Sequence, residues 1–121
     1  MKKVLLDTNF ILTSIRNKID FTEDIKFLGL EILIPEQVVN ELKNILNSKK
    51  KLRFKQESKI ALKLIIPFKK IDLKFKNTDN GIINFAKNNP DIIIATLDRE
   101  IKKKIKNPKL IIRNKKKLEI I

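Results

Sequence analysis

A short apolar run that stops at a carboxylate opens the chain. The residues from Val4 to Leu6 are all apolar, and Asp7 follows them directly. An unbroken run of this kind is typical of a strand buried on both faces, as in a parallel sheet covered by helices on either side. Because ligands bind outside the carboxyl ends of the strands in such sheets, we expect Asp7 to face a binding crevice.

A second stretch, near the other end of the chain, has the same pattern. The apolar run from Ile92 to Ala95 is followed by Thr96 and Asp98, so two carboxylates are predicted at one edge of one sheet. Helical and extended patterns alternate around these runs, which is typical of the α/β class. We expect strands at about 4–6, 31–34, 92–95 and 110–112, and either a strand or an extended connection at 68–75. Helices are expected at about 10–15, 22–29, 36–48, 56–64, 79–88 and 99–105, and a basic, then apolar tail at 115–121.

The composition limits the chemistry that is open to the chain. Its 121 residues suit one domain, residues 1–121, with a single core. The absence of Cys and His excludes disulfides, a cysteine nucleophile and the commonest zinc ligands, so catalysis would have to use carboxylates, hydroxyls, amides, Lys or Arg. Since no apolar run could span a membrane and no signal-peptide pattern is present, we expect a soluble cytoplasmic protein without a membrane partner.

The charge balance points to a polyanionic partner. Lys and Arg number 28 against 14 Asp and Glu, which gives a net charge of +14. Nucleic acid is the commonest polyanion in a cell, although a solvated Lys-rich surface is the alternative explanation. Aromatic residues are few, which favours contact with the nucleic-acid backbone over base stacking. The basic residues cluster at Lys102–Lys104, at Lys115–Lys117 and at Lys49, Lys50, Lys51 and Arg53. The last four are predicted to bind nucleic acid, and the alternative is that they only solubilise the chain.

Glu41 is a third candidate acid. In the helix expected at 36–48, the apolar side chains share one face at about 100° per residue, and Glu41 falls on the shoulder of that face. A carboxylate there could point along the edge of the sheet. The alternative is a boundary Glu that pairs with a Lys.

Asp79 is a fourth candidate acid. It lies on the same side of its expected helix as the core residues Ile82 and Ala86, one turn before them. The alternative is a first-turn Asp that the helix dipole favours, with Thr78 as the cap, and Asp98 could likewise cap the helix that follows it.

Four carboxylates at one edge of a sheet would repel one another. Their repulsion raises the pKa values or disfavours folding unless a cation neutralises the charge. Hard oxygen ligands without His or Cys select Mg²⁺ or Mn²⁺ over Zn²⁺. Metal-assisted hydrolysis of phosphodiester bonds needs neither His nor Cys, and it suits a strongly basic protein.

Four motifs in this order and at these spacings resemble those of the PIN-domain ribonucleases. They are Asp7-Thr8-Asn9 after an apolar strand, Val38-Val39-Asn40-Glu41-Leu42, Thr78-Asp79-Asn80-Gly81-Ile82 and Ile94-Ala95-Thr96-Leu97-Asp98-Arg99-Glu100. Within the family, the chain looks most like the small archaeal members related to ribosomal-RNA-processing nucleases and like the VapC-type proteins.

The resemblance implies a three-layer α/β/α fold with a mostly parallel sheet of about five strands. It also implies a Mg²⁺- or Mn²⁺-dependent endoribonuclease, in which Thr96 and Asn9 support the acids. Two positions depart from the common pattern, since Asn80 replaces a second Asp and Leu97 replaces Asn, and so mechanisms with one or two ions stay open. The implied acidic quartet is Asp7, Glu41, Asp79 and Asp98, of which Asp7, Asp79 and Asp98 would hold the metal.

Several functions remain compatible with this resemblance. A toxin of a toxin–antitoxin pair would need a small antitoxin protein, whereas an RNA-processing nuclease would not, and the family also implies a homodimer. A catalytically weak or inactive RNA-binding module is the alternative to an enzyme. A small-molecule enzyme would need a Gly-rich phosphate loop after the first strand, and the two Gly residues of the chain, Gly29 and Gly81, do not supply one.

Overall fold

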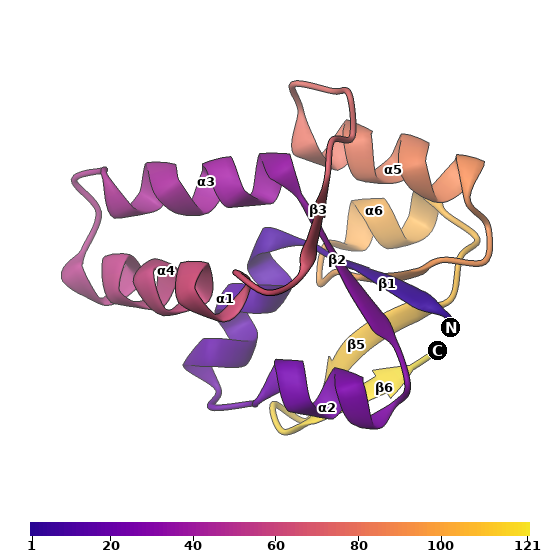
Figure 1. Cartoon of the computed structure of the whole chain (residues 1–121), viewed down its shortest axis with the longest axis horizontal. Coiled ribbons are helices and arrows are strands. Elements are labelled where there is room, and N and C mark those ends of the chain that lie inside the picture. Colours follow the sequence, from indigo (N-terminus) through magenta and orange to yellow (C-terminus); the bar gives the residue numbers. More distant parts are fainter.

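The computed structural model describes residues 1–121 and is built around one six-stranded sheet (Figure 1). The order across the sheet is β3-β2-β1-β4-β5-β6, and all neighbours are parallel except β5 and β6. β1 and β4 are therefore adjacent central strands, and both end at the same edge. The strands are β1 (Lys3–Leu6), β2 (Glu31–Pro35), β3 (Lys69–Ile71), β4 (Ile93–Ala95), β5 (Lys109–Arg113) and β6 (Lys117–Ile120).

Helices cover both faces of the sheet. Side chains alternate along β1, so that Val4 and Leu6 enter one core and Leu5 enters the other. The expected three-layer α/β/α sandwich with a mostly parallel sheet is thus confirmed. The larger core is covered by α1 (Thr8–Arg16), α2 (Phe21–Phe27), α3 (Glu36–Leu46) and α4 (Leu52–Leu64), and the smaller one by α5 (Thr78–Asn88) and α6 (Arg99–Lys104).

The sixth strand corrects the expectation of about five strands. Residues 117–120 form β6 beside β5, where the sequence pattern indicated only a basic, then apolar tail. The chain reverses through Asn114 and Lys115, whose φ angles are 53° and 59°. The commoner hairpin sequences place Gly at such positions, so this turn gave no clear signal.

Side-chain caps begin α1 and α5. Asp7 is the N-cap of α1, and Asn77, and not the Thr78 considered above, is the N-cap of α5. Asn77 Oδ1 accepts from the Asn80 N–H at 2.9 Å, and Asn caps a helix at least as well as Thr does.

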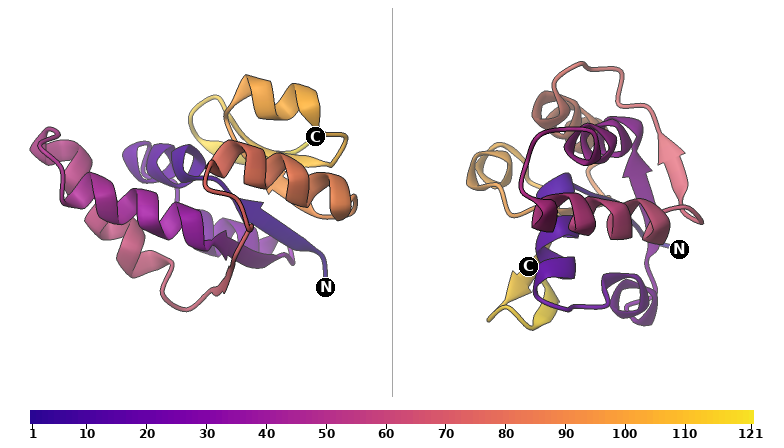
Figure 2. Two further views of the ribbon diagram at one scale, coloured as in Figure 1. Left: turned by 90° about the horizontal axis from the view of Figure 1, so that it is seen from above. Right: turned by 90° about the vertical axis from the view of Figure 1, so that its left-hand side faces the viewer.

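The α3–α4 hairpin extends away from the sheet (Figure 2). Helices were expected at about 36–48 and 56–64, but α3 ends at Leu46 and α4 already begins at Leu52. The exposed basic residues of the segment 49–53 therefore lie partly in a short loop and partly on the first turn of α4. None of the helices is long and apolar enough to cross a membrane.

Candidate active site

Asp7 lies at the carboxyl end of β1 and at the start of α1. Its backbone N–H donates to the Ala95 carbonyl at the end of β4, 3.0 Å away, which ties the two strand ends together. Its Oδ1 accepts from the Thr8 N–H at 2.8 Å and thereby caps α1. The side chain is 5% exposed. The strand-to-helix transition therefore holds this carboxylate in one orientation.

Thr96 connects Asp7 to the second strand end. Its hydroxyl donates to Asp7 Oδ2 at 2.9 Å and accepts from the Asp98 N–H at 3.1 Å. Thr96 is completely buried. Since every polar atom of this link is paired, Thr96 fixes both the second oxygen of Asp7 and the backbone that presents Asp98.

Thr8 connects Asp7 to α3. Its hydroxyl donates to Glu41 Oε1 at 2.8 Å, while its N–H holds Asp7 Oδ1. Glu41 is half-buried, in agreement with its place on the shoulder of the apolar face of α3. It forms no ion pair with a Lys, and so it is not the boundary pair that was the alternative.

Asp98 and Asp79 begin the two helices of the smaller core. Asp98 Oδ1 accepts from the N–H groups of Glu100 and Ile101 at 2.8 and 3.2 Å, so that Asp98 caps α6. This cap leaves its other carboxylate oxygen without a protein partner. Asp79 lies in the first turn of α5 and is exposed, less enclosed than its place on the helix suggested. Partial burial and the charge of Asp98 raise the pKa of Asp79, which places the two acids within electrostatic reach of each other.

The electrostatics of the site converge on Asp7. Burial raises the pKa of Asp7 to about 6, against hydrogen bonds from Thr96 and Thr8 that lower it. The negative charges of Asp79 and Glu41 raise this pKa further. Acids from two helices, α3 and α5, thus act on one carboxyl group, and a nearby cation would favour its charged form.

The four acids form two neighbouring pairs and not one tight cluster. Asp7 and Glu41 share Thr8, whereas Asp79 faces Asp98 across the starts of α5 and α6. No three acidic side chains form a group that could hold an ion as they stand. The donor set still fits Mg²⁺ or Mn²⁺, because all donors are hard oxygens and Mg²⁺ often binds through one or two carboxylates and keeps several waters.

The remaining predicted residues lie around this group or away from it. Asn9 is exposed on the first turn of α1, and it makes no side-chain hydrogen bond within the chain. Lys49, Lys50 and Lys51 lie in the loop between α3 and α4, and Arg53 lies on the first turn of α4. The structure therefore places these basic residues at the far end of α3 from the sheet, and not among the acids.

Thr8 is the residue that sequence reasoning missed. It was noted only as part of the motif around Asp7, without a role, yet it bridges Asp7 and Glu41. A hydroxyl directly after a strand-end Asp was the available signal. Its partner on α3 could not be identified without the packing of α3 against α1.

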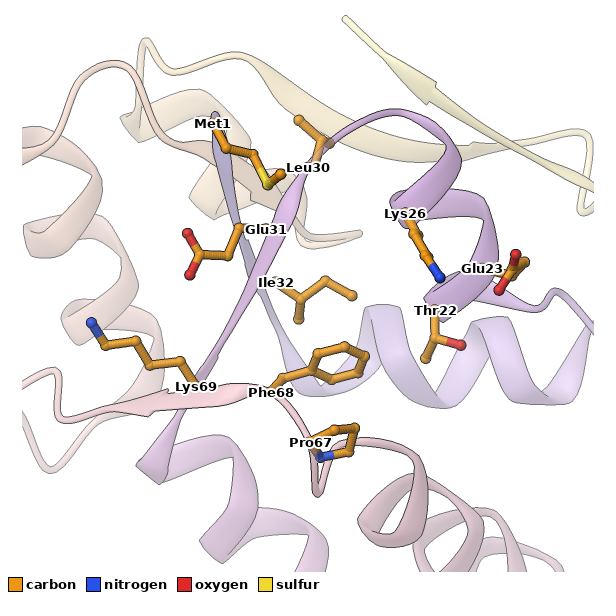
Figure 3. A pocket seen from close by; sticks show the side chains of 10 residues that line it. All are labelled: Met1, Thr22, Glu23, Lys26, Leu30, Glu31, Ile32, Pro67, Phe68 and Lys69. Carbon is orange, nitrogen blue, oxygen red and sulfur yellow. The ribbon is translucent and has the colours of Figure 1, made fainter.

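A separate pocket of about 460 Å³ lies between α2, β2 and the start of β3 (Figure 3). Leu30, Ile32 and Phe68 give it an apolar floor, and Glu23 and Lys26 of α2 lie at its rim. Its lining belongs to the starts of β2 and β3, the opposite edge of the sheet from Asp7, and it contains none of the four acids.

Comparison with known proteins agrees with this geometry. Residues 4–115 match the model of a PIN like domain. The chain is similar to "Ribonuclease VapC4" of Methanocaldococcus jannaschii, with 34% identity over 127 residues that cover 99% of this chain and 97% of the relative.

Two solved structures have a similar fold. The PIN domain endonuclease Utp24 superposes with a TM-score of 0.78 at 25% identity, covering 98% of this chain and 90% of the other. VapBC2 from Rickettsia felis, bound to a DNA fragment from its promoter, gives a TM-score of 0.61 at 18% identity, covering 88% and 98%. At that identity the second likeness is one of fold alone.

Proposed function

The chain belongs to the PIN-like domain family, and on this premise we propose that it is a divalent-metal-dependent endoribonuclease. Residues 1–121 would act as one nuclease domain in the cytoplasm, either in RNA processing or as the toxin of a toxin–antitoxin pair. The observation that carries the proposal is the hydrogen-bonded link from Glu41 through Thr8 to Asp7 and from Asp7 through Thr96 to Asp98.

The four acids would have two different roles in catalysis. Asp7, Asp79 and Asp98 would hold Mg²⁺ or Mn²⁺, directly or through water, and Glu41 would orient the water that attacks the phosphorus atom. The ion would supply an activated water and neutralise negative charge on the scissile phosphate.

The chain's own groups prepare the site before any ion binds. Thr8 and Thr96 each hold one oxygen of Asp7, which fixes its rotamer, and Thr8 also aims Glu41. Such preorganisation keeps the reacting groups oriented, and misplacing them by about 1 Å can lower a rate about 100-fold. Asn9, exposed beside Asp7, could contact the RNA or a bound water.

The tip of the α3–α4 hairpin would bind the RNA backbone. Lys49, Lys50, Lys51 and Arg53 are exposed there, and none of them is in an ion pair. The Arg53 guanidinium lies 4.9 Å from the centre of the Phe54 ring, which restricts the side chain and leaves its donors free for phosphate.

The partners follow from the two forms of the proposal. As a toxin, the protein would bind a small antitoxin and would be expected to form a homodimer. As a processing nuclease, it would need RNA alone. The name of the relative VapC4 favours the first form, because the VapC-type proteins that the chain resembles are toxins of such pairs, whereas the likeness to the endonuclease Utp24 is compatible with both forms.

Cleavage of a labelled structured RNA in Mn²⁺, in Mg²⁺ and in EDTA tests the proposal. We expect cleavage only with a divalent ion, and its loss in Asp7→Asn and in Asp98→Asn. Both substitutions keep a side chain that can cap a helix, so folding should be retained. Asp24→Asn, at an exposed acid of α2 away from the group, is the matched control and should cleave normally. Salt-sensitive binding without cleavage in either metal would favour the alternative, an inactive RNA-binding module.

A further inference from the structure

The two helices of the smaller core have opposite chemistry at their two ends. α5 and α6 lie side by side, and both run from the carboxyl ends of the strands toward the amino ends (Figures 1 and 2). Asp79 and Asp98 mark their starts, whereas Lys87 and Lys104 lie in their last turns. The helix dipole favours acids at starts and Lys at ends, and this explains the order of the charges along each helix.

The dipole does not explain why these lysines share a pocket with a third. Lys87, Lys104 and Lys106 line a hollow of about 200 Å³ together with Pro90 and Asn107, and we call it the basic pocket. The lining contains no Leu, Ile, Val, Met or Phe side chain. Three ammonium groups around one hollow repel one another, and an anion would relieve that repulsion.

None of the three lysines of the basic pocket is in an ion pair with a carboxylate. The structure has two ion pairs, Arg16–Glu57 and Arg113–Glu119, and neither includes a pocket lysine. The positive charge of the pocket is therefore free to act on a ligand from solution.

The wall of the basic pocket is rigid. Asn107 is 3% exposed, and its amide nitrogen donates to the carbonyls of Asn89 and Ile92, each at 2.9 Å. These bonds fix the turn before β4 against the segment after α6. The hollow between the two helix ends is thus part of the folded structure.

A second basic hollow adjoins the first. It shares Pro90 with the basic pocket and contains Lys2 and Lys3 at the start of β1, with Asp91 as its one acid. The amino-terminal edge of the sheet is therefore strongly positive, opposite the acidic edge. This surface includes part of the cluster Lys102–Lys104, for which the proposed catalytic site gives no role.

We propose that the basic pocket binds backbone phosphates of the RNA strand whose scissile bond lies at the acidic edge. The proposal rests on the proposed ribonuclease function. Asp79 and Lys87 are eight residues apart on α5, which corresponds to about 12 Å along the helix axis. At a rise of about 3.4 Å per nucleotide, a stacked strand would span this distance with about four nucleotides. The enzyme would then select RNA that continues several nucleotides beyond the cleaved bond.

Binding measured without cleavage tests the proposal directly. The probe is a labelled single-stranded RNA of about ten nucleotides, bound to the full chain carrying Asp7→Asn, at several salt concentrations. Adding Lys87→Gln, Lys104→Gln and Lys106→Gln should make the negative slope of the log association constant against log salt shallower by about 2. The reason is that about 0.7 counterions are released for each phosphate that a Lys neutralises. Since a slope difference of about 2 is a factor of about 100 for a tenfold change in salt, the loss of affinity relative to the parent should be about 100-fold larger in 0.1 M salt than in 1 M salt.

Three controls separate an effect of the pocket from an effect of overall charge. Lys63→Gln removes an exposed Lys from the last turn of α4, outside the basic pocket, and should leave the slope almost unchanged. The substitutions Lys87→Arg, Lys104→Arg and Lys106→Arg keep the charge and should give the slope of the parent. An RNA of about two nucleotides, too short to reach from the acids to the pocket, should lose far less affinity than the longer one.

The outcomes distinguish this proposal from the ribonuclease function. Equal salt slopes for the triple Gln variant and for Lys63→Gln would overturn the pocket, even if the wild-type chain cleaves RNA. A lysine-dependent slope, together with a wild-type chain that cleaves no RNA in Mg²⁺ or Mn²⁺, would support the pocket and refute the enzyme. Binding of inorganic phosphate in the pocket, seen as amide shifts at Asn107, without any dependence on RNA length, would assign the pocket to a free anion and overturn the RNA proposal.

Discussion

Asp7→Asn should stabilise the folded protein at neutral pH, because it removes a charge that the fold buries. The pKa of Asp7 is raised from the ordinary 3.8 to about 6, chiefly by burial. At 1.36 kcal/mol per pKa unit, this difference amounts to about 3 kcal/mol of lost stability when Asp7 is ionised. Replacing the carboxylate weakens the hydrogen bond from Thr96, at a cost of about 1 kcal/mol. The expected net gain is about 2 kcal/mol at pH 8.

The sign follows from proton linkage. Because the folded protein holds this proton more tightly than the unfolded chain, the penalty is fully present above about pH 6 and disappears as the pH falls toward 3.8. Between pH 8 and pH 5 the advantage of Asp7→Asn over the wild type should therefore shrink by about 1.4 kcal/mol.

Urea unfolding in EDTA, followed by far-ultraviolet circular dichroism, would measure these values. The chain has no Trp or Tyr, so intrinsic fluorescence would report little. Asp91→Asn, at an exposed acid, is the control and should track the wild type at each pH. A difference between Asp7→Asn and wild type that stays constant from pH 5 to pH 8, or that grows as the pH falls, would refute the reasoning.

Three further predictions concern the hydroxyls and the metal. Thr8→Val removes the hydroxyl that donates to Glu41 and should lower the cleavage rate by tenfold or more while the protein stays folded, whereas Thr8→Ser should retain activity. Equal cleavage rates for the two variants would show that the bridge is dispensable. Ser58→Ala removes a buried hydroxyl without a partner and should raise the unfolding free energy by about 1 kcal/mol, whereas a loss in urea denaturation would mean that the hydroxyl is satisfied. Mn²⁺ at 100 times its Kd should add about 2.7 kcal/mol to the wild type and far less to Asp7→Asn, and equal thermal shifts would argue against Asp7 as a ligand.

The parts of the fold that depend on local sequence patterns could be predicted from the sequence. The apolar runs ending at Asp7 and before Asp98 predicted two strands that end at one edge of one sheet, and the structure shows them as the neighbouring parallel strands β1 and β4. The shoulder position of Glu41 likewise followed from helical periodicity, because one face of α3 must be buried. The burial pattern, the helical periodicity and the charge are properties of short segments, and for this reason they could be predicted from the sequence.

The rest depends on contacts between distant segments. The bond from Thr8 to Glu41 joins residues 33 positions apart, and the basic pocket forms only when the ends of α5 and α6 meet. The strand β6 was missed for a local reason, since Asn114 and Lys115 adopt positive φ without Gly. Single-sequence patterns contain neither kind of information.

The double role of Asp7 and Asp98 bears on how such a protein could lose its activity in evolution. Each carboxylate caps a helix and is also a candidate catalytic group. Most replacements would therefore damage folding and would be eliminated together with the function. Asn is the exception, because it caps a helix as well as Asp does, and one nucleotide change in the codon converts Asp to Asn. Inactive descendants of this fold should therefore carry Asn at these positions more often than any other residue.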